Sequence, residues 1–267
     1  LPESQEKQLV KGLELSLKVN GPDNHLEYLL DFQSGDDTGK VHGKGTLTLA
    51  SENPVNLDNA ESQATLDISS WEIADLLAIL ANSGNLPEGS GQINGQVKVA
   101  GSVESGLTFT GNLSARQVKL HGGPLTSDTP SLDQVNVVLD GVKTGSTLTI
   151  NTLALDSPLA KGTASGTLGT DGQKEVASTM TFDLASLFTQ FPATLKLKEG
   201  LAISSGQLHL DASAGGTPAA TSFAASARLD GLEGMAGTKK ILLDKPITVQ
   251  ARGEQSDKGL RLDNFTV

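Results

Sequence analysis

The residues that most often do chemistry in proteins are few and scattered along this chain. The four histidines, His25, His42, His121 and His209, stand alone, and none has a second metal ligand at the short spacing of an HExxH motif. His209 falls on the polar side of an alternating stretch, so we expect it at a solvated surface. Serines are abundant, but no GxSxG nucleophile motif occurs and there is no cysteine. These residue types predict neither a metal centre nor a nucleophilic enzyme.

Three weaker patterns could also suggest a site. Asp31, Asp36 and Asp37 could hold a cation, but the calcium-loop spacing and its terminal Glu are missing, and a hairpin turn explains them better. The glycine-rich stretches 91–95 and 162–169 lack the Lys-Ser/Thr and the helix start of a phosphate loop. Paired carboxylates of a glycan-cleaving enzyme stay an open alternative, although one Trp and one Tyr offer few aromatic platforms. We therefore expect no enzyme, no metal and no cofactor.

The composition indicates a sheet with one face exposed to solvent. Aromatic residues make up only 3% of the 267 residues, there are 30 glycines, and Leu, Val, Ile and Ala alternate with Thr, Ser, Asn and Asp. The net charge is -11 and the basic residues are scattered singly, so nucleic acid is not an expected partner. No apolar run approaches the roughly 20 residues of a membrane span. The chain begins without Met and ends within an alternating pattern, so we expect a segment of a longer protein whose anchor lies elsewhere.

The elements that would position these residues are many short strands and two short helices. Residues 13–19 and 26–32 alternate as a first antiparallel pair. A helix is expected over residues 69–82, begun by a capping box of Ser69 and Glu72, after a strand over 64–68.

A second helix is expected over residues 183–192, with Asp183 as its cap. A change of alternation near Arg116 and Gln117 predicts a bulge. Further strands are expected after the second helix, the first of them over residues 195–197.

One unit of this pattern occurs twice. The sequence Ser-Gly-Gln opens a strand at residues 90–92 and again at 205–207, 115 residues later, and a short apolar helix precedes it each time. We divide the chain into an N-terminal meander (1–69), a first helix-plus-strands block (70–182) and a second block (183–267), expected to form one continuous sheet.

We expect an all-β fold of about fifteen strands, an elongated antiparallel sheet curved into a trough, with two short capping helices. The alternative is a β-sandwich, in which two sheets bury their apolar sides against each other. In the first case the apolar side lines a groove open to an apolar ligand. The expected lining residues are Ile93, Val97, Val99, Leu107, Phe109, Val135, Val137, Leu139, Leu148, Ile150, Met180, Leu208, Leu210, Phe223 and Leu229.

The repeated unit resembles the AsmA-like, or TamB-like, family of Gram-negative envelope proteins, from about Thr65 onward. The similarity lies in a short helix followed by glycine-rich alternating strands. The segments that carry it are IADLL (73–77), GQINGQVKVAG (91–101), LTFTGNLSA (107–115), LTINTLAL (148–155), GTASGTL (162–168), DLASL (183–187) and GQLHL (206–210).

The resemblance implies a periplasmic β-sheet with an apolar interior, anchored in the inner membrane through a segment not present here. It implies phospholipid acyl chains as partners, moved between the inner and outer membranes, and it brings no catalytic residues. The alternative function is a scaffold that assists outer-membrane protein assembly by adding strands to its edges.

Overall fold

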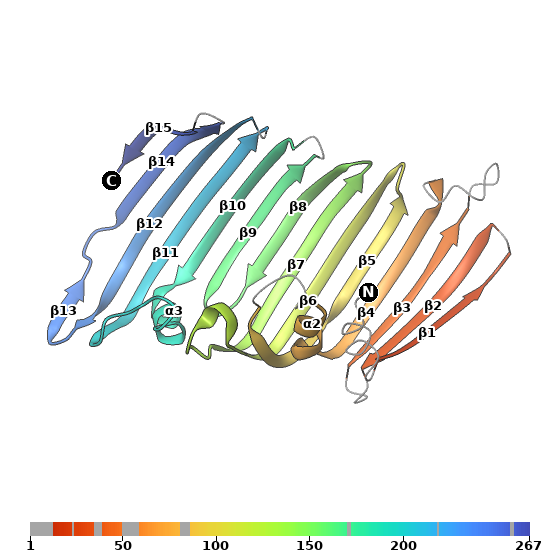
Figure 1. The fold of residues 1–267 in the computed structure, drawn as a ribbon, viewed down its shortest axis with the longest axis horizontal. Coiled ribbons are helices and arrows are strands. Elements are labelled where there is room, and N and C mark those ends of the chain that lie inside the picture. Colours follow the sequence, from red (N-terminus) through yellow and green to blue (C-terminus); the bar gives the residue numbers. More distant parts are fainter. Residues whose placement is uncertain are drawn as a thin grey trace.

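The computed structural model describes residues 13–22, 24–34, 39–49, 59–80, 86–169, 172–217, 219–256 and 259–267. Within these ranges all strands belong to one 15-stranded antiparallel sheet, in which nearly every strand pairs with the next one along the chain. The single departure is β13, which lies off the path and pairs with β12, so that β12 also pairs with β14. The sheet is elongated and curved, with β1 and β15 at its two ends (Figure 1).

The longest strands are β5 to β7 and β11 to β12, and the shorter strands β8 to β10 lie between these two groups. Their bounds are β1 Leu13–Asn20, β2 His25–Ser34, β3 Lys40–Thr48, β4 Glu61–Glu72, β5 Glu88–Ser102, β6 Gly106–His121, β7 Ser131–Thr144, β8 Thr147–Asp156, β9 Ala160–Leu168, β10 Lys174–Asp183, β11 Leu201–Gly216, β12 Ala220–Ala236, β13 Lys239–Leu242, β14 Ile247–Ser256 and β15 Gly259–Thr266. The expected all-β fold with one antiparallel sheet is confirmed. The sandwich alternative is wrong for the described residues, because their strands all join one sheet.

Two short α-helices interrupt the meander at the same end of the strands (Figure 1). Helix α2 (Ile73–Leu80) follows β4, and α3 (Leu184–Gln190) follows β10. A 3-10 turn, η3 (Gly123–Leu125), lies between β6 and β7. Asp183 caps α3 as expected, since its carboxylate accepts a hydrogen bond from the Ser186 N–H at 2.7 Å.

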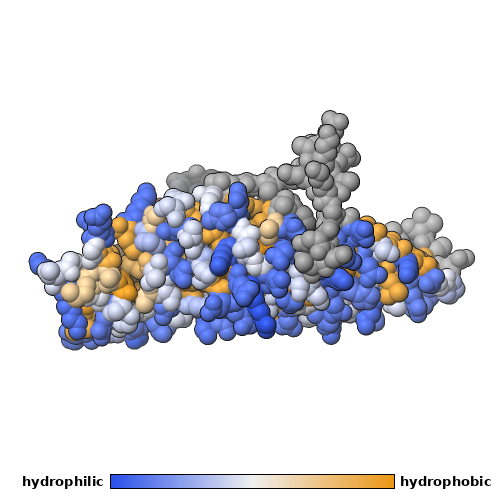
Figure 2. Space-filling model, turned by 90° about the horizontal axis from the view of Figure 1, so that it is seen from below, coloured by the Kyte–Doolittle hydropathy of each residue, from blue (hydrophilic) through white to orange (hydrophobic). Residues whose placement is uncertain are grey.

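The register keeps apolar side chains on one face of the sheet. Leu17 pairs with Leu30, and Met180 pairs with Leu210. Because successive side chains point to opposite sides, this pairing places the aliphatic residues together and the hydroxyl, amide and charged residues on the reverse. We call these two sides the apolar face and the polar face. Seen from the helix end, hydrophilic side chains follow one long margin of the molecule (Figure 2).

The fully buried part is small, and its largest apolar side chains lie where the helices meet the apolar face. Trp71, Ile73 and Leu184 are 5%, 7% and 6% exposed. Trp71 also stacks on Phe32 of β2, with ring centroids 5.0 Å apart. The helices therefore close one end of the apolar face and leave the middle of the strands only half-buried.

The expected capping box of the first helix is wrong. Ser69 and Glu72 belong to β4, which stays paired with β5 as far as Glu72 through a bulge. Ser70 has a positive φ of 50°, and the side-chain oxygen of Asn94 accepts its backbone N–H at 2.9 Å. Because pairing with β5 satisfies this backbone, the helix begins only at Ile73.

The strand expected over residues 195–197 is also wrong, since residues 192–196 form turns. Asp128, in the loop before β7, holds this segment: its carboxylate accepts the N–H groups of Ala193 and Thr194 at 2.9 and 2.6 Å. The Thr194 hydroxyl donates a hydrogen bond to the Leu125 carbonyl oxygen at 3.0 Å. These contacts join the loop before β7 to residues 192–196 at the end of the sheet. Residues 192–196 are therefore held by the loop and not by pairing with a strand.

Candidate functional site

The candidate site is the apolar face itself. All of the expected lining residues, from Ile93 to Leu229, lie on this one face by their register, and all are half-buried. Rows run across the strands: Val99 pairs with Phe109, and Leu113 pairs with Val137. The bulge expected near Gln117 is present in β6, where the register against β5 shifts. Such shifts keep the apolar residues of neighbouring strands on the same side.

Large side chains of this face lie over glycines of the next strand. A Cβ at Gly141 would be 2.5 Å from Cζ of Phe109, and one at Gly253 would be 2.8 Å from Cζ of Phe223. Each ring therefore occupies the space above a glycine of its partner strand instead of standing away from the sheet. Because the rings lie over these glycines, the apolar surface is continuous and rises little above the sheet. Sequence reasoning missed this arrangement, because it depends on which residues pair.

Apolar exposure is greatest at the two ends of the sheet. Leu15 and Leu17 of β1 are 67% and 61% exposed, and Leu260 and Phe265 of β15 are 65% and 61% exposed. Among the residues that the structure describes, each of these strands has a paired neighbour on one side only. Within the described ranges, no strand pairs with the outer backbone groups of β1 and β15, and such groups can accept a further strand.

The repeated Ser-Gly-Gln unit (90–92 and 205–207) forms the contact between each helix and the sheet. Gly91 and Gly206 both have positive φ, 130° and 144°, and both lie at register shifts of the strand that follows a helix. A Cβ at Gly91 would meet the Arg116 carbonyl oxygen and Ile73, and a Cβ at Gly206 would meet Leu232 and Leu184; Ile73 and Leu184 are the first residues of α2 and α3. A side chain at either glycine would therefore crowd both the helix and the neighbouring strand, and it would strain the backbone.

Short-range polar pairs stabilise much of the polar face. The Asp31 carboxylate is 2.7 Å from His42 Nδ1, and Gln96 donates to Asp67 at 2.6 Å. Asn151 donates to Asp140 at 2.6 Å. These partners sit on adjacent strands, so they support the sheet and do not converge on one reacting atom.

His209 lies on the polar face, as expected, within a small network. Its Nδ1 is 3.0 Å from the Thr181 hydroxyl and its Nε2 is 3.7 Å from Asp230. The pKa of Asp230 is lowered, first by its hydrogen bonds from the Arg228 guanidinium and then by the charge of that group. A carboxylate held ionised by an arginine is an ion-pair partner, which makes it a poor proton donor or acceptor near neutral pH.

Among the described residues no three His, Asp or Glu side chains come together as a metal site. Asp31 is held by His42, while Asp36 and Asp37 lie outside the described residues. No helix within those ranges has the length and apolar character needed to cross a membrane. The described side chains thus offer an extended surface and no compact reactive cluster.

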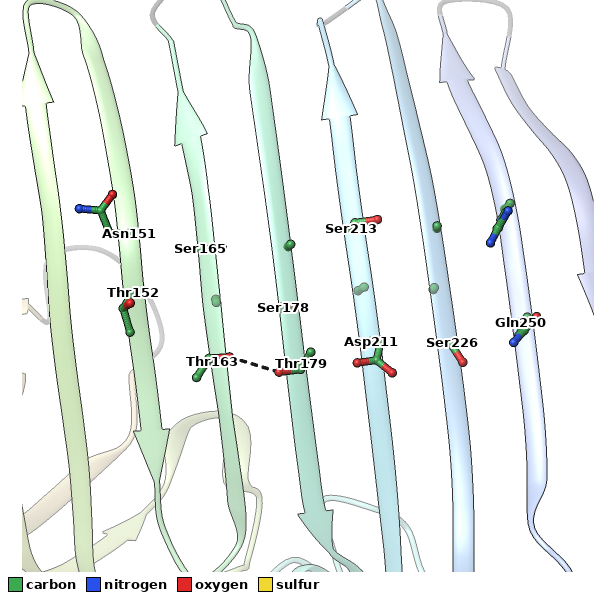
Figure 3. Close-up of a pocket in the computed structure, with 16 residues that line it drawn as sticks. Asn151, Thr152, Thr163, Ser165, Ser178, Thr179, Asp211, Ser213, Ser226 and Gln250 are labelled. Atoms are coloured by element: carbon green, nitrogen blue, oxygen red, sulfur yellow. Dashed lines mark hydrogen bonds between the residues drawn. The ribbon is translucent and has the colours of Figure 1, made fainter.

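The polar face carries hollows that the sequence analysis did not predict. One opens over β8 to β14 with a volume of about 520 Å³ (Figure 3). A smaller one, of about 290 Å³, lies over β5 to β7 beside Asn112 and Asn136. No sequence signal marked them, because each forms where small side chains of several strands fall next to one another.

The chain matches no protein-family model, no curated protein and no solved structure.

Proposed function

We propose that this chain is a periplasmic segment of an AsmA-like envelope protein whose apolar face carries phospholipid acyl chains between the inner and outer membranes. The observation that supports the proposal most is the continuity of that face, which extends from β1 to β15 without a polar strand between. Anchoring in the inner membrane falls to a segment of the longer protein outside this sequence.

Apolar contact between an acyl chain and this face would hold the lipid, and such contact has no preferred direction. Each methylene removed from water contributes about 0.8 kcal/mol, wherever along the face it lies. Half-buried Leu, Val, Ile and Phe side chains cover most of the strands, and β9 continues the face with Gly162, Ala164 and Gly166, so an acyl chain can shift from strand to strand in contact with apolar groups. The head group stays at the water-exposed margin, and the net charge of -11 gives anionic lipids no electrostatic hold.

Two neighbouring valines on β7 provide a matched test. Val137 lies on the apolar face, and Val138 lies on the polar face, where it is 41% exposed. A lysine at Val137 puts a charge among the acyl chains, whereas a lysine at Val138 points into water.

We expect Val137→Lys to reduce phospholipid bound to the purified chain, measured by native mass spectrometry after expression in the periplasm, and to weaken the outer membrane in cells. Val138→Lys should match the parent protein. Equal lipid content and equal envelope integrity in both variants would rule the proposal out.

A second candidate function, a scaffold that assists outer-membrane protein assembly, is supported by the open edges. Strands β1 and β15 expose both apolar side chains and outer backbone groups, which is what a β-rich client needs for strand addition. Photo-crosslinkers separate the two functions: a lipid path gives adducts at Leu210 on the face, and a scaffold gives protein adducts at Leu17 on the edge.

A further inference from the structure

The hollow over β8 to β14 lies on the polar face, opposite the surface proposed for lipid. Figure 3 shows Thr163, Thr179, Asp211, Ser226 and Gln250 at a similar height on five successive strands of the sheet. The register confirms that they form one row, since Thr163 pairs with Thr179, Thr179 with Asp211, Asp211 with Ser226 and Ser226 with Gln250. The row crosses the strands at steps of about 4.8 Å.

The next row forms the hollow because its side chains are small. Ser165, Ala177, Ser213 and Ala224 stand side by side on β9 to β12, and Arg252 on β14 closes the row. A ligand can therefore approach the sheet closely here while it remains within hydrogen-bond reach of the first row. This combination gives a groove that runs across the strands, with one polar wall.

The lining mixes alanines with hydroxyl and amide side chains and carries one charge of each sign. Asp211 and Arg252 are both exposed, and within the described ranges neither forms a salt bridge or a side-chain hydrogen bond. Elsewhere on the polar face, Asp67 and Asp140 are each held by an amide side chain. The remaining polar groups are hydroxyls and amides, which both donate and accept hydrogen bonds.

We propose that this groove binds a neutral, 1,4-linked hexopyranose chain lying across the strands. Successive sugar rings present hydroxyls at a spacing close to that between strands, so one row of protein groups can meet several rings in turn. A neutral polyol suits a lining with no net charge, whereas an acidic polymer would meet Asp211 and a net charge of -11. An apolar ligand would leave the hydroxyls and amides of the row without partners.

Titration of the purified chain with cellohexaose and chitohexaose, followed by two-dimensional amide NMR, tests the proposal. We expect saturable binding of at least one probe, with the largest shifts at Thr179, Ser213 and Ala224. Asp211→Ala should weaken binding about tenfold, the loss expected for a hydrogen bond to a charged group. Ala177→Gln, which fills the groove and removes no hydrogen-bonding group, should weaken it at least as much.

Lys18→Ala on β1 is the control and should bind as the parent does. These three positions are exposed, so their variants should keep the parent's unfolding midpoint. If neither probe binds at millimolar concentration, or if binding is unchanged in both groove variants, the proposal is overturned. Because the readout lies on the polar face, its failure leaves the lipid proposal standing.

Discussion

At the scale of single residues, the apolar face depends on glycines that lie beneath larger side chains. Gly141 and Gly111 are both buried on neighbouring strands, but only Gly141 is covered by an aromatic ring. A Cβ at Gly141 would meet Phe109 at 2.5 Å and the Thr149 carbonyl oxygen at 2.6 Å, whereas one at Gly111 would meet Val97 at 3.6 Å, an ordinary contact. Neither glycine has a positive φ, so the comparison isolates packing.

We predict that Gly141→Ala lowers the free energy of unfolding by about 1–3 kcal/mol, the usual cost of overpacking. Gly111→Ala should be neutral or stabilise by up to about 1 kcal/mol, because alanine restricts the unfolded chain. Urea unfolding of both variants measures the difference. Equal stabilities would mean that Phe109 does not cover Gly141.

A second prediction at this scale concerns Asp128. Burial of this carboxylate acts to raise its pKa, but hydrogen bonds from Thr194 and from the N–H group of Ala193 outweigh burial, so the pKa is lowered. A lowered pKa in the folded state stabilises the protein above the unfolded value, near 3.9, and this stabilisation is lost as the pH falls through the folded value.

Asp128→Asn should therefore be less stable than the parent at pH 7, and the gap should shrink as the pH falls below about 4. The measurement is urea unfolding at both pH values, with Asp133→Asn, an exposed carboxylate, as the control. A gap that does not depend on pH would show that the ionised carboxylate does not hold the loop.

At the scale of elements, the helix–glycine–strand unit sets where the sheet is closed. Gly91 has a φ of 130°, and a Cβ there would meet the Arg116 carbonyl oxygen at 2.8 Å and Ile73 at 3.0 Å. We predict that Gly91→Ala costs about 1–3 kcal/mol and loosens α2. Hydrogen exchange should show α2 amides losing protection first. Gly215→Ala, whose Cβ would meet nothing closer than 3.7 Å, should leave protection unchanged.

The strands and the first helix show which parts of the fold can be predicted from the sequence. Period-two alternation located nearly all strands and the side of the sheet on which each apolar residue lies, because that period is local. The capping box of Ser69 and Glu72 was misleading, since pairing of β4 with β5 kept those residues extended. Contacts such as Asp128 with Thr194 and the hollow beside Asp211 depend on residues far apart in sequence or on several strands at once, so no local pattern indicates them.

At the scale of the whole molecule, one sheet presents two chemically different surfaces. The apolar face is continuous and low, with its closed end beneath α2 and α3, and the polar face is hydrogen-bonded and hollowed. The central claim is that acyl chains travel on the first of these surfaces. Adjacent residues on one strand point to opposite faces, so they compare the two surfaces at the same position.

The most direct test places a photo-crosslinking residue at each member of two such pairs, Leu113 with Asn112 on β6 and Leu210 with Asp211 on β11, in cells. We expect phospholipid adducts at Leu113 and Leu210 and none at Asn112 or Asp211, identified by mass spectrometry of the purified protein. Adducts at the polar members alone, or no lipid adduct at any of the four positions, would contradict the central claim.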